Sequence, residues 1–557
     1  MNACLQLKKS NCKNCYKCIR FCPVKSIRME DNQAHIINEE CILCGRCFVN
    51  CPQNAKEIRN DLPRAKELLA SGKPVYASVA PSYIANYDGT TITGMRLALE
   101  KLGFAGAEET AIGATIVKRE YENLVRDRAQ KVIISSCCHT VNKLIQKHYP
   151  GALKYLAKVA SPMQAHCAKL KEEHPDCYTV FIGPCISKKD EAEQYPGTVD
   201  CVLTFEELTL WLDEAGIRLE DLPDAKERGR ARLFPTAGGI LRSMDLEDGY
   251  DYVIIDGAEN CLSALADIED GALSDCFIEM SACTGSCIGG PAMDRARQHH
   301  VQEFIKVGRT AGKTDFPVAQ PAPEKLAKAF PFEGTRQQMP GSLAIQEILK
   351  KLGKDSPEKE LNCGSCGYNT CRDKAVAVLQ GKADLSMCLP YLKEKAESFS
   401  DAIIGNTPNG IFVLNEQLEF QQINAAAQQI MGVKNGAELI GEPVVRLMDP
   451  SDYLFAMTNG QNVYEKKKYL EQYEKYIEET ILYDKEYHII VSIMKDVTEE
   501  EKVQQNKERQ SQRAVEITDR VVEKQMRVVQ EIASLLGETT AETKIALTKL
   551  KETLADE

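Results

Sequence analysis

The sequence predicts a multidomain protein that combines α+β and α/β domains. Three observations predict this class. Cysteine-rich runs open the chain, short apolar segments alternate with helical stretches from about residue 73, and no cysteine occurs after residue 388. Alternating strands and helices are typical of parallel sheets with helices on both faces. A chain of 557 residues, 43% of them hydrophobic, is long enough for three or four domains.

Composition and charge exclude several classes of protein. The formal net charge of −12 argues against nucleic-acid binding, because phosphate binding relies on clustered Lys and Arg. No apolar stretch could act as a signal peptide, and none reaches the roughly 18 to 20 residues of a membrane helix. We therefore expect a cytoplasmic protein without a membrane partner. In that reducing compartment, 23 cysteines indicate metal ligation or redox chemistry rather than disulfides.

The first two cysteine runs share one spacing. Both "CKNCYKCIRFCP" (12–23) and "CILCGRCFVNCP" (41–52) read C-x2-C-x2-C-x3-C-P. This repeat resembles bacterial two-cluster ferredoxins, which implies a two-[4Fe-4S] domain over residues 1–70. In that family the fourth cysteine of each run binds the other cluster. The implied ligands are Cys12, Cys15, Cys18 and Cys51 for one cluster, and Cys41, Cys44, Cys47 and Cys22 for the second. A pair of zinc knuckles is the alternative.

Cysteines also end three of the predicted α/β strands. Six strands are predicted, over residues 73–81, 131–138, 178–185, 199–205, 251–259 and 277–283. The second, third and sixth end in "SSCC", "GPC" and "SAC". Open α/β sheets bind ligands beyond the carboxyl ends of their strands. Cysteines that served only as core residues would scatter along the strands, so their position at one edge predicts a metal site.

The loops after these strands resemble the three signature loops of [FeFe]-hydrogenases. The matching motifs are "SSCC", "GPCISKKDE" and "EMSACTGSCIGG", together with "VAPS" and "FPTAGG". The resemblance implies an H-cluster domain over residues 71–312. Its cofactor is a [4Fe-4S] cubane joined to a diiron unit with CO, cyanide and an azadithiolate bridge. The implied cubane ligands are Cys138, Cys185, Cys283 and Cys287, with Cys287 bridging to the diiron unit. Cys137 is implied as the thiol that passes protons to and from the bridging amine.

Four further residues have roles implied by the same resemblance. Lys188 would donate a charge-assisted hydrogen bond to one cyanide, and Ser82 would serve the other. Pro81 and Phe234 would form apolar walls that keep water from the irons. The alternative for Lys188 is an ordinary surface lysine, and we expect Lys189 to be one.

Two departures from the family's pattern concern packing on the diiron unit. Gly183 and Ser281 stand where prototypical enzymes have methionine. Two thioethers are thereby replaced by a void and a hydroxyl, and we expect this softer packing to lower turnover.

Other departures concern proton delivery. In "TIVKREYENL", Arg119 stands at the place of the first expected glutamate and Glu122 at the second, while Glu120 is a possible substitute. His139 replaces the usual proline after the cysteine pair. It is either a structural residue or a proton relay.

A proline-rich linker (313–340) precedes a second small cysteine domain (341–394). Its cysteines have the spacing C-x2-C-x4-C-x16-C, and they are Cys363, Cys366, Cys371 and Cys388. The pattern is similar to the four-cysteine iron–sulfur domain of corrinoid iron–sulfur proteins, which implies a third further [4Fe-4S] cluster. Zinc is the alternative. The other cysteines have no partner spacing and are expected in the core: Cys4, Cys167, Cys177, Cys201, Cys261 and Cys276.

The cysteine-free C-terminal part resembles a PAS domain over residues 395–498. The resemblance rests on "GIFVLN", on "QINAAAQQIMG" with Asn424 on its helix, and on the "DVT" exit. PAS domains bind small ligands or pass conformational signals, usually as dimers. The absence of cysteine excludes a flavin–cysteinyl adduct. Haem ligation by His488 is a weaker alternative to an ordinary strand residue.

The tail over residues 499–557 is predicted to be helical. Four apolar residues recur every seven positions, at Val515, Val522, Val529 and Leu536, which suits a dimeric coiled coil. The alternative is an amphipathic helix packed on its own PAS domain.

Together these parts resemble PAS-containing sensory [FeFe]-hydrogenases of group C. The leading hypothesis is an H2 sensor that oxidises H2 slowly and passes the redox state of its clusters to a kinase- or phosphatase-type partner. Its expected partners are H2, protons, ferredoxin or another redox protein, and a second copy of the chain. A second hypothesis is an ordinary ferredoxin-coupled hydrogenase. A third is a Narf-like Fe-S assembly or carrier protein, against which Cys137 and Lys188 argue.

Overall fold

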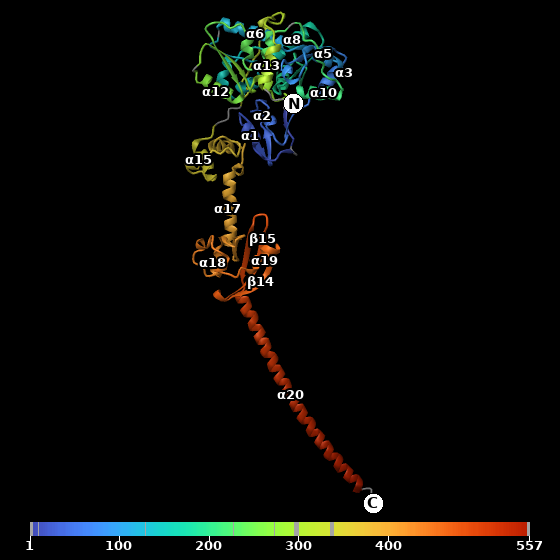
Figure 1. The fold of residues 1–557 in the computed structure, drawn as a ribbon, viewed down its shortest axis with the longest axis vertical. Helices are drawn as coiled ribbons and strands as arrows, with labels where there is room; N and C mark the ends of the chain where they lie inside the picture. The colour runs from blue at the N-terminus through green and yellow to red at the C-terminus, as the bar shows by residue number, and fades with distance from the viewer. Residues whose placement is uncertain are drawn as a thin grey trace. The chain divides into compact units, whose positions relative to one another are not determined.

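A computed structural model describes residues 4–8, 11–128, 130–226, 228–271, 273–294, 300–334 and 339–553 (Figure 1). The chain divides into two compact units, Met1–Leu392 and Lys393–Glu557. All the cysteines lie in the first unit. In the part of the chain that is described, no helix is both long and apolar enough to cross a membrane.

The N-terminal domain consists of two small antiparallel sheets and two short helices. Its elements are β1 (Leu5–Leu7), α1 (Lys17–Phe21), β2 (Ile27–Glu30), β3 (Gln33–Ile36), α2 (Arg46–Val49) and β4 (Lys56–Ile58). β1 pairs with β4 and β2 with β3. Each helix begins inside a cysteine run, after a left-handed residue: Tyr16 (φ 55°) or Gly45 (φ 72°). A Cβ at Gly45 would lie 2.5 Å from Pro291, so only glycine allows this loop to approach the next domain so closely.

Two parallel sheets form the α/β domain. The first has the order β6-β5-β8-β9, from Gly106–Glu109, Val75–Val79, Tyr178–Gly183 and Cys201–Thr204. The second has the order β10-β11-β7, from Asp251–Asp256, Cys276–Ser281 and Val132–Ile134. All six predicted strands are present, and β6 is an additional one. The three loops that carry the paired and single cysteines follow β7, β8 and β11.

Helices pack against both sheets and enclose separate hydrophobic cores. They are α3 (Leu62–Ala70), α4 (Tyr83–Asn86), α5 (Ile92–Lys101), α6 (Ala111–Asp127), α7 (His139–His148), α8 (Pro162–Glu173), α9 (Ser187–Gln194), α10 (Phe205–Glu214), α11 (Gly239–Ser243), α12 (Ala258–Glu269), α13 (His300–Thr310) and α14 (Pro323–Leu326). Their starts are locally encoded. For example, Thr204 and Glu207 form a capping box that begins α10 directly after β9.

The second cysteine domain docks on the N-terminal domain. It contains α15 (Ser342–Lys351) and α16 (Cys371–Leu379). Arg20 donates to the carbonyl of Gly364 at 3.2 Å, and Lys25 donates to that of Gly367 at 3.1 Å. α17 (Leu389–Asn406) begins at the residue after Cys388 and continues into the second unit.

The second unit is a five-stranded antiparallel sheet with flanking helices. Its strand order is β13-β12-β16-β15-β14, from Phe420–Ile423, Gly410–Asn415, Ile489–Asp496, Lys475–Asp484 and Val463–Leu470. Asn424 caps α18 (Ala425–Ile430), because its Oδ1 accepts from the backbone N–H of Ala427 at 2.8 Å. α19 (Ser451–Asn459) covers the sheet. His488 lies in an exposed turn against Glu416, with 67% of its side chain accessible, which disfavours the haem alternative.

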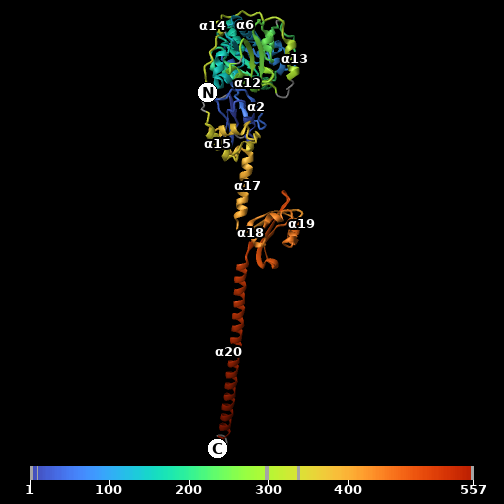
Figure 2. The same ribbon diagram turned by 90° about the vertical axis from the view of Figure 1, so that its left-hand side faces the viewer.

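The tail is one helix, α20 (Thr498–Thr553), seen along its length in Figure 2. Its first turns contact the sheet, where Gln505 donates to the hydroxyl of Tyr476 at 3.0 Å. The predicted seam beyond them is exposed, with side chains between 53% and 60% accessible at Val515, Val522, Val529 and Leu536. The seam therefore does not pack on its own PAS domain, contrary to the alternative drawn from the sequence.

Candidate active site and cluster sites

A cavity lies at the carboxyl ends of the two parallel sheets. Residues that follow β5, β7 and β8 form its walls, among them Pro81, Cys138 and Cys185. Further wall residues are Ser82, Thr110, Cys137, His139, Phe181, Lys188, Phe234, Glu279, Ser281 and Cys287. The predicted loops therefore converge on one enclosed space.

The four proposed cubane ligands are near one another and deep among protein atoms, although the Cys287 side chain is accessible from the cavity that it lines. Burial raises the pKa of Cys287 to about 12 and that of Cys283 well above its usual value, and the charges of Cys138 and Cys185 add to both effects. Thiols in such a place stay neutral unless a metal stabilises the thiolates. Among the described residues, no group of His, Cys, Asp or Glu closes tightly enough to hold a single metal ion. The donor set and the open volume fit a multi-iron cluster.

Cys137 differs from its neighbour in having a hydroxyl partner. The Tyr121 hydroxyl lies 3.2 Å from Cys137 Sγ and 3.0 Å from Ser136 Oγ. Burial raises the pKa of Cys137 to about 12, so the thiol keeps its proton. Tyr121 does not stand out in the sequence, because one tyrosine in a helix carries no pattern.

Lys188 lies on the cavity wall with its charge compensated. Its ammonium donates to the backbone carbonyl of Cys137 at 3.1 Å and pairs with Glu191, which also pairs with Lys328. Burial opposes the Lys188 charge, but Glu191 outweighs it and raises the pKa of Lys188. Two of its three N–H donors have described partners, so one is left for an acceptor in the cavity.

Lys189 is not the surface lysine expected from the sequence. It is 1% exposed, and its ammonium lies 2.9 Å from carboxylates of both Asp61 and Glu207. In "SKKDE", adjacent lysines on α9 point to different sides, and both sides are covered. The charge of Lys189 and its place in a polar stretch of sequence therefore did not mean that its side chain is exposed.

Ser82 supplies a second donor without a partner. Its side chain is fully buried on the cavity wall, and its Oγ has no hydrogen-bond partner in the described protein. A buried hydroxyl without a partner is costly. An anionic ligand in the cavity would satisfy it. Pro81 and Phe234 line the same space, as the sequence predicts.

The space beside Gly183 is filled rather than empty. A Cβ on Gly183 would lie 2.8 Å from the ring of Phe181, which lines the cavity. The void expected from the loss of methionine is thus occupied by Phe181. Ser281 does present a hydroxyl-bearing side chain at the wall, nearly buried.

The expected glutamates of α6 do not line the cavity. Glu122 pairs with the buried Lys118 at 2.9 Å, and Arg119 pairs with Asp315 at 3.3 Å. Glu120 accepts a hydrogen bond from Asn123 at 3.3 Å. These side chains serve ion pairs and helix-surface contacts instead of facing the cysteine pair.

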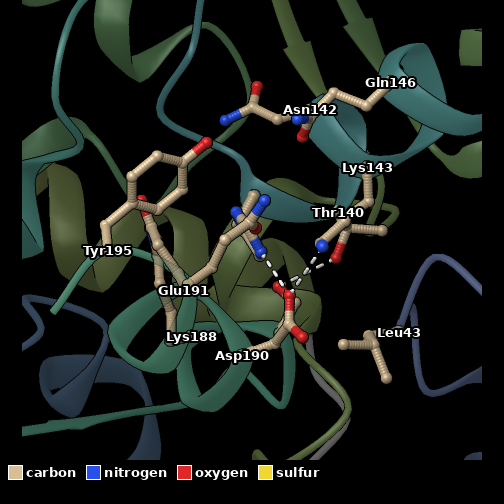
Figure 3. A network of polar contacts seen from close by, with 12 residues as sticks. Leu43, Thr140, Asn142, Lys143, Gln146, Lys188, Asp190, Glu191 and Tyr195 are labelled. Atoms are coloured by element: carbon tan, nitrogen blue, oxygen red, sulfur yellow. Dashed lines mark hydrogen bonds and ion pairs between the residues drawn. The ribbon is translucent and has the colours of Figure 1, made fainter. Parts of the chain in front are cut away.

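His139 connects the cavity wall to a network of charged side chains. Its Nε2 lies 2.8 Å from Asp190, which also pairs with Lys143 at 3.1 Å. Figure 3 shows Asp190 and Lys143 facing each other beside Lys188 and Glu191. Burial lowers the pKa of His139, and its Nδ1 has no described partner. The contact with Asp190 fits the structural role considered for His139. That contact uses Nε2 and leaves the other ring nitrogen, Nδ1, without an assigned role.

Glu279 is a cavity residue that the sequence does not reveal. It lies inside β11, where its Oε2 accepts from the backbone N–H of Leu241 at 3.0 Å. Burial raises its pKa to about 7. A charged residue inside an otherwise apolar strand is unusual. This unusual position is the feature of the sequence that could have indicated a functional role for Glu279.

Replacing Glu279 with glutamine should stabilise the protein progressively as the pH rises from about 5 to 7. Over that range the unfolded carboxyl ionises while the folded one keeps its proton, so the wild type loses up to about 3 kcal/mol. Below pH 4.5 both are protonated and this difference disappears. Melting temperatures of both proteins from pH 4.5 to 8 test this. A difference that does not change with pH would contradict the buried, protonated carboxyl.

Two smaller cavities hold the N-terminal cysteines in crossed sets. The first is lined by Cys12, Cys15, Cys18 and Cys51. The second is lined by Cys22, Cys41, Cys44 and Cys47. The fourth cysteine of each run thus joins the other run's three, as the ferredoxin resemblance implies.

The last four proposed ligands line a third small cavity: Cys363, Cys366, Cys371 and Cys388. Its neighbour Tyr368 packs in one apolar cluster with Ile19 and Cys22 of the N-terminal domain. Cys44 of the N-terminal domain lies close to Cys283. Burial is the largest cause of the raised pKa of Cys283, the thiols at Cys185, Cys138 and Cys287 come next, and Cys44 adds to them. The cysteine groups are therefore neighbours in space.

Replacing Cys388 with serine should remove about four iron atoms per chain if this site holds a [4Fe-4S] cluster. Removing one thiolate breaks the four-ligand set, while Cys177→Ser changes a buried cysteine outside every set and should leave iron content unchanged. Elemental analysis for iron, sulfide and zinc measures this. One zinc per wild-type chain, lost in the Cys388 variant without loss of iron, would support the zinc alternative.

Comparisons with known families identify the domains. Residues 73–291 match the family "Iron only hydrogenase large subunit, C-terminal domain". Residues 4–52 match a 4Fe-4S dicluster domain, residues 360–390 an Fe-S cluster family, and residues 398–533 the PAS fold. The predicted ferredoxin, hydrogenase-type and PAS domains are confirmed.

Individual relatives are more distant. The periplasmic [Fe] hydrogenase large subunit of Nitratidesulfovibrio vulgaris is 27% identical over 51% of this chain and 85% of that protein. Iron hydrogenase 1 of Clostridium pasteurianum is 25% identical over 43% and 53%. A cytosolic Fe-S cluster assembly factor of Eremothecium gossypii is 27% identical over 35% and 47%. The latter two matches span about half of each relative. The chain contains an [FeFe]-hydrogenase-like domain and a PAS domain.

Proposed function

We propose that this protein is an H2-sensing [FeFe]-hydrogenase that oxidises H2 reversibly at low turnover and relays its redox state to a signalling partner. The observation that carries the hydrogenase part is a buried cavity lined by Cys137, Lys188 and three of the cubane-type cysteines, Cys138, Cys185 and Cys287. The fourth, Cys283, lies close to these three cysteines. The similarity to two hydrogenases supports the proposal.

The residues around the cavity fit an H-cluster. Cys138, Cys185, Cys283 and Cys287 would hold the cubane. When bound, the diiron unit would supply heterolytic cleavage of H2. The protein's part is to move the proton and exclude water: the Cys137 thiol accepts and releases protons within the cavity, while Pro81 and Phe234 keep solvent out. Lys188 and Ser82 each offer a donor to the cyanides.

Electrons would leave through the N-terminal domain. Its second site, which contains Cys22 and Cys44, lies beside the cavity cysteines on one side and Tyr368 of the third site on the other. This position makes the second ferredoxin site a branch point for electrons. One route leads to the first ferredoxin site and an external redox partner, such as ferredoxin. The other route leads to the site at Cys388, where α17 begins.

The second unit would carry the signal. α17 joins the proposed cluster at Cys388 directly to the PAS domain, and α20 presents an exposed apolar seam for a second copy. The described part of the unit is a PAS sheet with α18, α19 and α20, and we propose that a kinase- or phosphatase-type partner supplies the output. We place the protein in the cytoplasm.

An Fe-S assembly or carrier function is the second candidate. It is favoured by the assembly-factor relative, which is similar over 35% of this chain. An ordinary ferredoxin-coupled hydrogenase is the third, and low turnover of the purified protein would argue against it.

One experiment separates these functions. The full-length protein is matured with a synthetic diiron cofactor, and infrared spectra are recorded under argon and H2. We expect CO and cyanide bands that shift under H2. Protein that holds its iron–sulfur clusters but shows no such bands would favour the assembly function and overturn the hydrogenase proposal.

A further inference from the structure

A chain of four hydrogen-bonded side chains leads from the cavity wall through the first parallel sheet to the surface. Thr110, at the start of α6, lines the cavity, and its hydroxyl lies 2.7 Å from Ser78 Oγ in β5. Ser78 Oγ lies 2.8 Å from His166 Nδ1 in α8. His166 Nε2 lies 3.2 Å from the carboxylate of Glu108 at the sheet edge. The first three side chains are buried, and the Glu108 side chain is 31% accessible.

The hydrogen bonds that link these four side chains are all donated in the same direction, from the cavity toward the surface. Glu108 is an acceptor only, since the hydrogen bond from His166 lowers its pKa to about 2. His166 Nε2 must therefore carry a proton, and burial lowers the His166 pKa so that the ring is neutral. Its Nδ1 is then an acceptor for Ser78, whose oxygen in turn accepts from Thr110. Every O–H and N–H bond points from the cavity toward Glu108.

The charges around His166 keep this arrangement in place. Glu108 also pairs with Lys169 at 3.3 Å, and Lys169 pairs with Glu173 one helical turn further along α8. From α6, Gly113 lets helix α8 approach closely, because a Cβ there would lie 2.7 Å from the Cβ and the backbone nitrogen of His166. Glu108, Lys169 and Glu173 are the charged groups that act most strongly on the His166 ring. The ring is thus held between one hydroxyl and one carboxylate.

The order Ser78–His166–Glu108 also resembles a hydrolytic triad. That function needs a serine open to substrate, whereas Ser78 is fully buried and its hydroxyl is taken up by Thr110. Only Thr110 reaches the cavity. The geometry therefore suits passage of a proton better than nucleophilic attack.

We propose that Thr110, Ser78, His166 and Glu108 conduct protons between the cavity and solvent. The proposal rests on the proposed hydrogenase function, and it assigns an exit to protons that Cys137 releases in the cavity. Cys137 and Thr110 line the same cavity, and a single water molecule held between them would carry the proton from the thiol to Thr110 Oγ1. A proton arriving at Thr110 Oγ1 displaces that hydroxyl's own proton onto Ser78, and Ser78 passes its proton to His166 Nδ1. His166 then releases its Nε2 proton to Glu108 and on to water. One bond to hydrogen forms and one breaks at each step. Rotation of the hydroxyls and a change of imidazole tautomer restore the chain.

The test uses full-length protein matured with the synthetic diiron cofactor. Thr110→Val removes the hydroxyl at the cavity end with little change in volume, whereas Thr110→Ser keeps it. Thr115→Val is the matched control, because Thr115 is equally buried on α6 but donates only to its own helix, at the Ala111 carbonyl. Glu108→Gln tests the solvent end.

Two readouts are compared in each variant: the H2-dependent infrared shift, and exchange of D2 with solvent protons, measured as HD by mass spectrometry. We expect Thr110→Val and Glu108→Gln to keep the infrared shift and to lower HD formation by about tenfold or more. Thr110→Ser and Thr115→Val should match the wild type. In the protein before addition of the diiron cofactor, nitrogen-15 NMR should show His166 as the neutral Nε2–H tautomer.

HD formation at the wild-type rate in Thr110→Val, with the infrared shift intact, would overturn the proton exit. So would a Nδ1–H tautomer of His166. If Thr110→Val loses its bands because it fails to fold, Glu108→Gln, at the accessible end, decides the question. Absence of CO and cyanide bands in the wild type would instead reject the hydrogenase function, so the two failures are distinguishable.

Discussion

Cys137→Ala should keep the CO and cyanide infrared bands and lower H2 oxidation by about 10²- to 10⁴-fold, the usual contribution of a positioned proton-transfer group. The thiol lies on the cavity wall, its pKa is raised by burial, and Tyr121 fixes its position. Alanine removes the proton carrier and leaves the four proposed cubane ligands untouched. H2 uptake with an artificial dye measures the loss.

Two other cysteines serve as controls for this result. Cys177→Ala changes a buried cysteine that does not line the cavity, and it should leave turnover unchanged. Cys138→Ala removes a proposed cubane ligand, and the bands should disappear with the cluster. Wild-type turnover in Cys137→Ala would show that protons reach the cavity by a route that bypasses this thiol.

The strands that the sequence predicts are those whose apolar residues are continuous. β5, β7 and β8 are buried on both faces, so runs such as VII and YTVFIG mark them. β6 has the sequence GAEE and is invisible to that criterion, although it pairs in parallel with β5 along its whole length. Its glutamates are placed by partners distant in sequence: Glu109 by the buried Arg232, and Glu108 by His166.

The residues of the candidate site also fall into those that the sequence predicts and those that it does not. Ligand cysteines can be predicted because metal binding requires fixed spacing. Roles that depend on tertiary contacts cannot, and Lys189 and Glu191 show why. Both lie in a highly polar run, yet each is buried, because Glu207 and Lys328 from other elements neutralise them. The same limit explains Phe181, which fills the space beside Gly183.

Truncation after Leu392 should preserve iron content, infrared bands and dye-coupled H2 oxidation while abolishing self-association. Every proposed ligand precedes residue 389, and the first compact unit ends at Leu392. The removed part carries the apolar residues available to a second copy: Phe399 and Ile403 on α17, and the seam of α20, all more than half exposed. Sedimentation of both proteins, with H2 oxidation in parallel, tests this.

A matched variant separates the seam from the PAS domain. Val522→Glu and Val529→Glu together keep the full chain but place like charges along the seam, and should also prevent self-association. Loss of H2 oxidation on truncation would contradict the independence of the first unit. A truncated protein that still self-associates would place the dimer contact outside α20 and the PAS domain.

Relay of the redox state requires more than a dimer. Oxidised and reduced clusters must favour different arrangements of the second unit, because an equilibrium shifts only through a difference in free energy between its states. α17 is the covalent route for that difference, since it begins beside Cys388 and ends next to β12. Hydrogen exchange of the matured full-length protein under H2 and under argon should therefore differ within residues 395–553. Identical exchange throughout that range, with shifting infrared bands, would leave an H2-oxidising enzyme whose PAS domain does not read its clusters.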